Sequence, residues 1–242
     1  MLDSLRPLLT ACVLTSVVCR RPGTQTASSS QPSIQASPTD SVQTPARLLI
    51  RLTPATPIRA VRLVDSTLHD FNVVQRFVYR VAISHASSSD TLPHILTVDQ
   101  PTLVGDSLVL GITYDSVAGS FSLFSYLAKT GILAVIPPPS DLSIAGSVPA
   151  FAPDGRHLAY VALPADGTWH GVVRQWPIGK VVAQTPSDTA PGTDVTIGWA
   201  DWQDAIHFTF YFGLSDVRWR RVRGSLDRVG FISDTVTSST NH

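Results

Sequence analysis

The stretch VPAFAPDGRHLAYVA, residues 148–162, carries the clearest signal for the fold of this chain. A tight turn is predicted at Pro153, Asp154 and Gly155. Pro restricts φ, Asp accepts hydrogen bonds from nearby backbone N–H groups, and Gly tolerates positive φ. In the strand that follows, Leu158 and Tyr160 would point to one face and Ala159 and Val161 to the other. Because both faces are apolar, this strand is predicted to lie between two packed layers.

The same turn and strand recur on both sides of this stretch. Asp154 aligns with Asp106 and Asp204, which lie 48 residues before it and 50 residues after it. Two glycines follow each aspartate at similar spacings, the first at Gly119, Gly167 and Gly213 and the second at Gly131, Gly179 and Gly224. Periods of about 40 to 50 residues with several short strands per unit are typical of propeller blades. We therefore expect the strands that begin near Leu108, His157 and Ile206 to be equivalent.

The central repeat resembles that of the TolB-like propellers, also called WD40-like PD40 repeats. Their recurring phrase is close to P-x-F-S-P-D-G-x-x-[LI]-A-F/Y. It is matched here at Pro149, Phe151, Pro153, Asp154, Gly155, Leu158, Ala159 and Tyr160, with Ala152 in place of the usual Ser. The repeats that begin at Asp106 and Asp204 keep the spacing but not the phrase. The resemblance covers about 130 residues and implies a β-propeller-like array of antiparallel blades.

The number of blades is the main departure from that pattern. Residues 99–232 contain three clear repeats, whereas closed propellers usually have about four to eight blades. Residues 47–98 read as strands, and they would supply either a fourth, irregular blade or a separate strand pair. Within them, 47–52 and 58–64 alternate Arg with aliphatic residues around a Pro-containing turn, as a hairpin would.

The composition favours strands over helices. All 18 acidic residues are Asp, and the chain contains no Glu. Only 15% of the residues are charged, against about a quarter in an average protein, and the formal net charge is zero. A chain without Glu that is rich in Val, Thr and Ser is readily written as strands and turns. The zero net charge argues against nucleic acid as a partner.

Residues 1–19 have the features of an export segment. Arg6 precedes a mostly apolar stretch, 7–18, which is within the range of a signal peptide and too short to span a bilayer as a helix. The stretch ends at Cys19, which suggests a bacterial lipoprotein that is lipidated at this residue. Cys12 follows Leu-Thr-Ala and fits a lipobox better, but it leaves almost no hydrophobic run before it. An ordinary cleaved signal and an uncleaved short anchor are the alternatives.

Two further segments are predicted to lack a packed core of their own. Residues 20–46 are dominated by Ser, Thr, Pro and Gln, and such a segment buries too little apolar surface to offset its ordering entropy. We interpret it as a disordered linker that tethers an extracytoplasmic domain. Residues 233–242 are interpreted as a flexible tail. The expected location is the periplasm or the outer face of a bacterial membrane.

Known catalytic motifs are missing from the sequence. It contains no G-x-S-x-G elbow, no Walker or dinucleotide glycine pattern and no EF-hand loop, and H-E-x-x-H is impossible without Glu. Both cysteines precede residue 20, so the body has no thiol nucleophile or disulfide. We expect no enzyme activity and no cofactor.

Metal binding has weak support. His157 and His207 follow equivalent aspartates by three residues and could converge in a central channel, but no third ligand accompanies them. Asp194, Asp201 and Asp204 could hold a cation, although Asp is common in solvated turns. We therefore assign no metal site.

Two groups of residues are candidates for a binding surface. The first contains Trp199 and Trp202, which flank Asp201 in an expected loop and could instead pack between blades. The second is the strongly basic segment 218–223, with four arginines. On a strand, Arg218 and Arg220 would share one face, opposite Trp219 and Arg221, with Arg223 two residues further on. This segment is either a solvated edge strand protected by charge or a contact for an acidic partner or lipid headgroups.

These features predict a non-enzymatic interaction module outside the cytoplasm. It would bind a protein partner or scaffold a membrane-associated complex. The alternative is a propeller, carbohydrate-active or not, that binds a small molecule or a glycan through the face containing Trp199 and Trp202. A metal-assisted enzyme is the third and weakest hypothesis.

Overall fold

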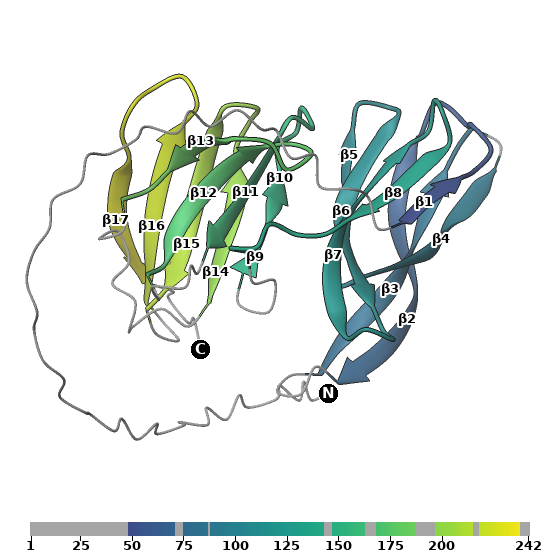
Figure 1. The fold of residues 1–242 in the computed structure, drawn as a ribbon, viewed down its shortest axis with the longest axis horizontal. Helices are drawn as coiled ribbons and strands as arrows, with labels where there is room; N and C mark the ends of the chain where they lie inside the picture. Colours follow the sequence, from purple (N-terminus) through teal and green to yellow (C-terminus); the bar gives the residue numbers. More distant parts are fainter. Residues whose placement is uncertain are drawn as a thin grey trace, which may run out of the picture. The chain divides into compact units, whose positions relative to one another are not determined.

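The computed structural model describes residues 48–70, 75–86, 88–142, 147–162, 168–186, 197–214 and 218–237. This part of the chain is all-β, with four small sheets arranged like the blades of a four-bladed propeller (Figure 1). Each sheet is built on strands that are consecutive in the sequence, and β1 and β9 are each added to a sheet formed later in the chain. All four sheets lie within one compact unit. No helix in the described ranges is long and apolar enough to cross a membrane.

The first two sheets contain the strands up to residue 136. The first sheet has the order β2 (Ala60–Asp70), β3 (Gln75–Ser84) and β4 (Ser89–Thr97). The second has the order β1 (Leu48–Arg51), β8 (Ile132–Ile136), β7 (Ser120–Leu127), β6 (Leu108–Asp115) and β5 (Thr102–Val104). The 47–98 segment therefore supplies a three-stranded blade together with an outer strand for the next one.

The third and fourth sheets complete the array. The third has the order β10 (Ala150–Phe151), β11 (His157–Ala162), β12 (His170–Gln175) and β13 (Val181–Gln184). The fourth has the order β17 (Ile232–Thr237), β16 (Arg218–Ser225), β15 (His207–Gly213), β14 (Gly198–Trp202) and β9 (Ser147–Val148). All pairings are antiparallel except that of β9 with β14. The last repeat was predicted to end at residue 232, but strand β17 extends to Thr237.

The repeat predicted from the sequence is confirmed. Strands β6, β11 and β15 begin at Leu108, His157 and His207, and each is the second strand of its own meander in a separate sheet. The predicted turn precedes β11. The Asp154 carboxylate accepts a hydrogen bond from the Arg156 N–H at 2.9 Å, and Gly155 has a φ of +69°. Asp204 caps the equivalent turn before β15.

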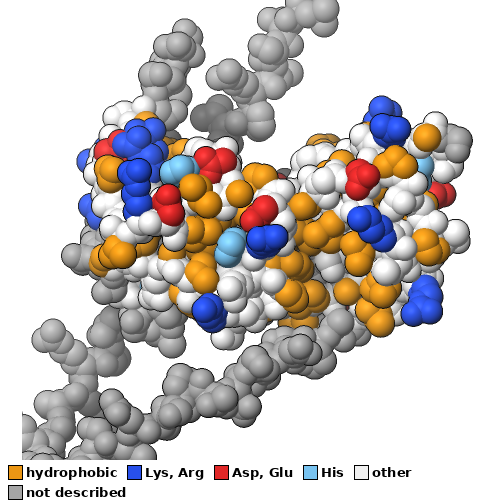
Figure 2. Space-filling view, turned by 90° about the horizontal axis from the view of Figure 1, so that it is seen from above, with side chains coloured by type: hydrophobic (Ala, Val, Ile, Leu, Met, Phe, Trp, Pro, Cys, Tyr) orange, Lys and Arg blue, Asp and Glu red, His pale blue; other side chains and the backbone are white. Residues whose placement is uncertain are grey.

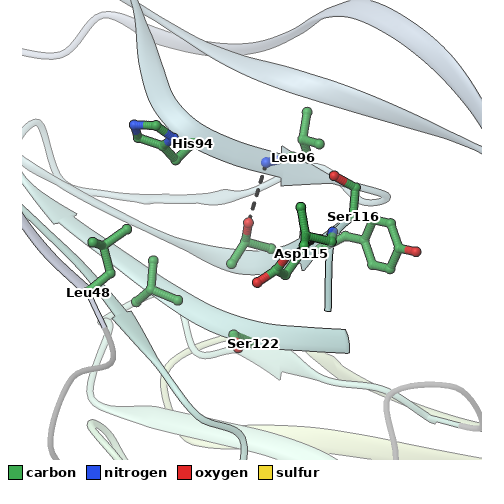
Figure 3. Close-up of a pocket in the computed structure, with 10 residues that line it drawn as sticks. Leu48, His94, Leu96, Asp115, Ser116 and Ser122 are labelled. Carbon is green, nitrogen blue, oxygen red and sulfur yellow. Dashed lines mark hydrogen bonds between the residues drawn. The ribbon is translucent and has the colours of Figure 1, made fainter. Parts of the chain in front are cut away.

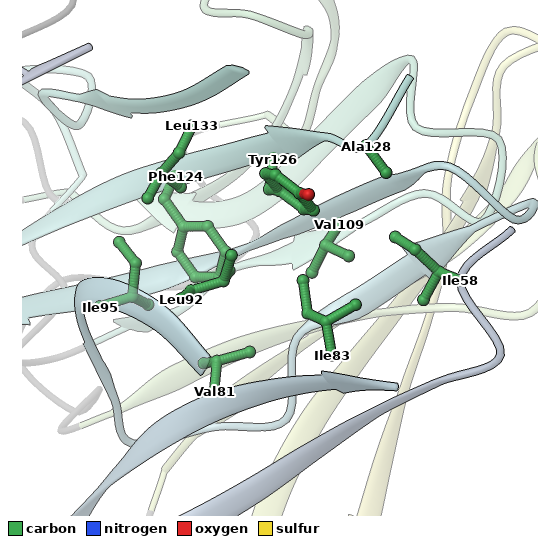
Figure 4. Close-up of a cluster of buried hydrophobic side chains, with 10 residues drawn as sticks. All are labelled: Ile58, Val81, Ile83, Leu92, Ile95, Val109, Phe124, Tyr126, Ala128 and Leu133. Atoms are coloured by element: carbon green, nitrogen blue, oxygen red, sulfur yellow. The ribbon is translucent and has the colours of Figure 1, made fainter. Parts of the chain in front are cut away.

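Apolar clusters join each sheet to the next along the chain. The first and second sheets share a core that includes Val81, Ile83, Phe124 and Leu133 (Figure 4). The second and third share one with Leu110, Leu123, Leu158 and Tyr160, and the third and fourth share one with Ala159, Val161, Phe208 and Phe210. Strand β11 thus contributes to two cores through its opposite faces, as its two apolar faces predicted.

The hairpin predicted for residues 47–52 and 58–64 is wrong. Strand β1 pairs with β8, where Leu49 lies opposite Ala134, and β2 pairs with β3. The intervening segment leads from the second sheet to the first, because the backbone N–H of Ile58 donates to Asp106 O at 2.7 Å and that of Arg59 donates to Ser84 O at 2.8 Å. Ile58 is buried in the core shared by the first two sheets, which accounts for the crossing.

Only some of the regularly spaced glycines lie in turns. Gly119 and Gly131 lie in hairpin turns with φ of +62° and +68°. Gly224, in contrast, is inside β16, where a Cβ atom would meet the Phe208 ring at 2.6 Å. Gly224 therefore serves close packing rather than a turn. Gly167 lies outside the described residues.

A partly buried hydrogen-bond network supports the packing of the third sheet. The Tyr160 hydroxyl donates to the Asp141 carboxylate at 3.0 Å and accepts from Arg174 Nε at 2.6 Å. Arg174 also forms an ion pair with Asp141, with 3.5 Å between Nη2 and Oδ2. Burial raises the pKa of the Tyr160 phenol well above its usual value of 10.

Alkaline pH should therefore destabilise the protein through Tyr160. The folded state holds the phenol proton more tightly than the unfolded state does, so the free energy of unfolding falls as pH rises above about 10. In Tyr160→Phe this fall should be smaller, and urea unfolding at pH 9, 10 and 11 measures it. Equal pH dependence in both proteins would contradict a role for Tyr160.

Candidate interaction surface

The fourth sheet has one face in the core and one face open to solvent in the described part of the chain. Phe208, Phe210 and Phe212 alternate along β15 and are fully buried against the third sheet. The residues between these phenylalanines point to the opposite face of the sheet. Their partners on the neighbouring strands point to that same face. We call this second face the outer face. It carries Trp199, Tyr211, Trp219, Arg221, Arg223, Ile232 and Asp234.

Three aromatic rings form a cluster on the outer face. Trp199 stacks on Tyr211 with centroids 4.7 Å apart and an interplanar angle of 19°. Trp219 packs edge to face against Trp199, with 4.3 Å between the ring centroids. Gly213 permits this arrangement, because a Cβ atom there would lie 2.7 Å from the Trp219 ring. All three rings are half-buried, so the cluster combines mutual packing with exposed aromatic surface.

Two arginines beside the aromatic cluster share one carboxylate. Arg221 donates to Asp234 through both Nε, at 3.0 Å, and Nη2, at 2.6 Å. Arg223 donates to the same carboxylate through Nη2 at 3.2 Å. The pKa of Asp234 is held below its usual range, mainly by the hydrogen bond from Arg221. The positive charges of Arg221 and Arg223 lower it further.

A pocket of about 430 Å³ opens on this face next to the arginines. It is lined by Gln203, Asp204, His207, Phe208, Thr209, Tyr211, Arg221, Arg223 and Gly224. Asp204 accepts hydrogen bonds from the backbone of Ile206 and from the backbone and ring of His207, which together lower its pKa to about 2. Asp204 is therefore charged at any physiological pH, and most of its acceptor capacity is used locally.

The residues of the two sequence candidates fall on different faces. Trp199 and Trp202 lie within β14 rather than in a loop, on opposite sides of the sheet. Trp202 packs against the core shared by the third and fourth sheets, and its Nε1 donates to Ala150 O at 3.0 Å. Only Trp199 contributes to the outer face, where it meets Trp219.

The basic segment divides in the same way. Arg221 and Arg223 point to the outer face with Trp219, whereas Arg218 and Arg220 point to the opposite face, in register with Thr237 and Thr235. The predicted alternation of this strand therefore holds. Figure 2 shows Lys and Arg side chains gathered over the end of the protein that contains this sheet.

Sequence reasoning missed three members of this site. Tyr211 and Asp234 come from β15 and β17, and strand register alone brings them beside Trp199 and Arg221. His207 was considered only as a metal ligand, whereas its Nδ1 lies 2.7 Å from Asp204 Oδ2. The alternation of Phe208, Phe210 and Phe212 was the available signal, since it assigns Tyr211 to the face opposite the core.

The possible metal ligands do not come together in the described ranges. No group of three or more His, Cys or Asp residues there could hold an ion. The Nδ1 atom of His157 is buried without a hydrogen-bond partner, and its ring lies 6.2 Å from that of Trp202. Asp194 lies outside the described residues, as do Cys12 and Cys19.

A second pocket, of about 460 Å³, lies among strands of the first two sheets (Figure 3). Its lining includes His94, Leu96, Thr113, Asp115 and Ser122. Thr113 Oγ1 accepts a hydrogen bond from the Leu96 N–H at 3.3 Å, and the Asp115 carboxylate caps the turn that follows β6. These polar groups thus have structural roles.

Comparison with models of protein families and with curated proteins finds no match to this chain. The fold and the outer face are therefore the basis for assigning a class. The chain is a propeller-like, all-β protein with an aromatic and arginine-rich face on its last sheet.

Proposed function

We propose that this protein is a non-enzymatic interaction module that binds a protein partner through the outer face of its fourth sheet. The observation that carries the proposal is the cluster of Trp199, Tyr211 and Trp219 beside Arg221 and Arg223. Trp, Tyr and Arg are the residue types that dominate binding energy at protein interfaces, where they lie near the centre of the contact.

The partial exposure of the outer face supports this assignment. The clusters shared by adjacent sheets are fully buried, whereas the three rings of the outer face are half-buried. Ile232, on the same face, is 67% exposed. Apolar and aromatic surface on one continuous sheet face favours a macromolecular partner over a single small ligand.

The proposal includes the compartment and the family. The apolar segment at 7–18 and the polar segment at 20–46 suit export and tethering, with Cys19 as the residue that would carry a lipid. The PDG turn before β11 and the succession of four meanders suit kinship with TolB-like PD40 propellers. Mass spectrometry of the mature N-terminus tests the anchor, because a free amine at a residue other than cysteine would exclude it.

Capture from detergent-solubilised membranes tests the proposed function. The wild-type protein should retain a specific partner, and Trp199→Ala should lose most of it, because truncating a central aromatic residue typically costs about 2 kcal/mol or more of binding energy. Val117→Ala, at a residue 97% exposed in a turn of the second sheet, is the matched control. Equal capture by all three proteins, or by none, would count against the proposal.

Glycan binding is the second candidate, and the stacking of Trp199 on Tyr211 favours it specifically. A flat aromatic surface beside carboxylate and guanidinium groups offers both apolar contact and hydrogen bonds to a sugar ring. Binding of defined oligosaccharides that is lost in Trp199→Ala, with no protein captured, would support this alternative.

A further inference from the structure

We propose that the pocket beside Arg221 and Arg223 receives a carboxylate of the partner protein, while an apolar side chain next to that carboxylate packs on the Trp199 cluster. This inference rests on the proposed function and adds the chemistry of the partner. It predicts an acidic residue flanked by aromatic or aliphatic residues on an exposed segment of that protein.

Unused hydrogen-bond donors are the first argument. A guanidinium group has five N–H donors. Arg221 directs two of its nitrogen atoms at Asp234 and Arg223 directs one. In the part of the chain that the structure describes, neither side chain has another hydrogen-bond partner. Both residues line the pocket, so several donors in fork geometry remain for a second carboxylate.

The local charge is the second argument. Two guanidinium groups face the single carboxylate of Asp234, which leaves one positive charge uncompensated at that point. The other acid of the pocket, Asp204, is held by His207 and two backbone N–H groups on the turn before β15. A carboxylate that enters beside Arg223 therefore meets the one guanidinium charge that Asp234 does not balance.

The distribution of acids favours a single carboxylate over a lipid surface. The fourth sheet and its turns carry four carboxylates, those of Asp201, Asp204, Asp227 and Asp234. An extended anionic bilayer would meet these carboxylates as well as the arginines, whereas a single side chain can contact the guanidinium groups of Arg221 and Arg223 alone. The apolar side chain next to that carboxylate then packs on the adjoining rings of Trp199 and Trp219.

Peptide binding to the full-length protein tests this inference. The probe is the capped peptide Gly-Phe-Asp-Phe-Gly, and its matched control has Asn in place of Asp. Fluorescence of the half-buried Trp199 and Trp219, together with isothermal titration, follows binding. We expect the Asp peptide to bind at least about tenfold more tightly than the Asn peptide, because hydrogen bonds to charged groups are roughly twice as strong as neutral ones. Added salt should reduce this difference.

Variants on the two faces of β16 make the test specific. Arg223→Gln should weaken binding of the Asp peptide about tenfold and leave the Asn peptide unchanged. Arg218→Gln is the control, because it removes an exposed guanidinium from the same strand but from the opposite face. Thermal unfolding of both variants should match that of the wild type, since surface changes usually shift stability by about 0.5 kcal/mol or less.

The possible outcomes separate this inference from the proposed function. Equal affinity for the two peptides, no binding of either, or equal loss in Arg218→Gln and Arg223→Gln would overturn the carboxylate pocket. Binding to vesicles of anionic lipid that Arg223→Gln abolishes would overturn it in favour of a lipid. If Trp199→Ala loses a captured partner while Arg223→Gln keeps it, the interaction module stands and the pocket assignment fails.

Discussion

The Phe210→Ala variant should lower the free energy of unfolding by about 3–5 kcal/mol, the range usual for removing a buried aromatic side chain. Phe210 is fully buried in the cluster that joins the third and fourth sheets, 5.3 Å from Phe208 between ring centroids. Gly171 of β12 faces its ring so closely that a Cβ atom there would collide with it. The contact between the two sheets is therefore tight, and little relaxation can fill the space left by the ring.

Urea unfolding followed by circular dichroism measures this loss. Phe77→Ala is the matched control, because Phe77 lies on β3 with 52% of its surface exposed. It should change the free energy of unfolding by no more than about 0.5 kcal/mol. A loss in Phe210→Ala as small as in the control would show that the third and fourth sheets do not share a packed core in solution.

The repeat was the part of the fold that local sequence could predict. The turn at Asp154 and the alternation after it depend on neighbouring residues only, and β11 with its two apolar faces follows from them. The spacing of Asp106 and Asp204 then extends this unit in both directions. The order of strands within each of these three meanders also follows, because consecutive strands joined by short turns pair with each other.

Long-range pairing was beyond the same reasoning. Strand β1 pairs with β8, about eighty residues later in the chain, and no local pattern distinguishes this partner from the neighbouring segment at 58–64. The outer face depends on pairing too, since register places Asp234 opposite Arg221 and Tyr211 opposite Trp199. Alternation alone could nevertheless have separated Trp199 from Trp202, because residues three apart on a strand face opposite sides.

The same long-range pairing gives Gly131 its importance. Gly131 occupies the turn between β7 and β8 with a φ of +68°, and its carbonyl accepts a hydrogen bond from the Leu52 N–H at 2.7 Å. A Cβ atom at this position would collide with the Leu52 carbonyl oxygen. A side chain there would have to displace the segment that follows β1, where that segment leaves its pairing with β8.

Gly131→Ala should therefore lower the free energy of unfolding by about 2–4 kcal/mol. Left-handed backbone strain accounts for about 1 kcal/mol or more, and the steric collision adds about 1–3 kcal/mol. Gly119→Ala is the matched control, because Gly119 has a φ of +62° and nothing within 4 Å of a Cβ atom. Gly119→Ala should lower the free energy of unfolding only by the cost of left-handed backbone strain, about 1 kcal/mol. Chemical denaturation of both variants measures the difference, which reports the docking of β1 on the second sheet. Equal losses would mean that the segment after β1 does not lie against the turn at Gly131.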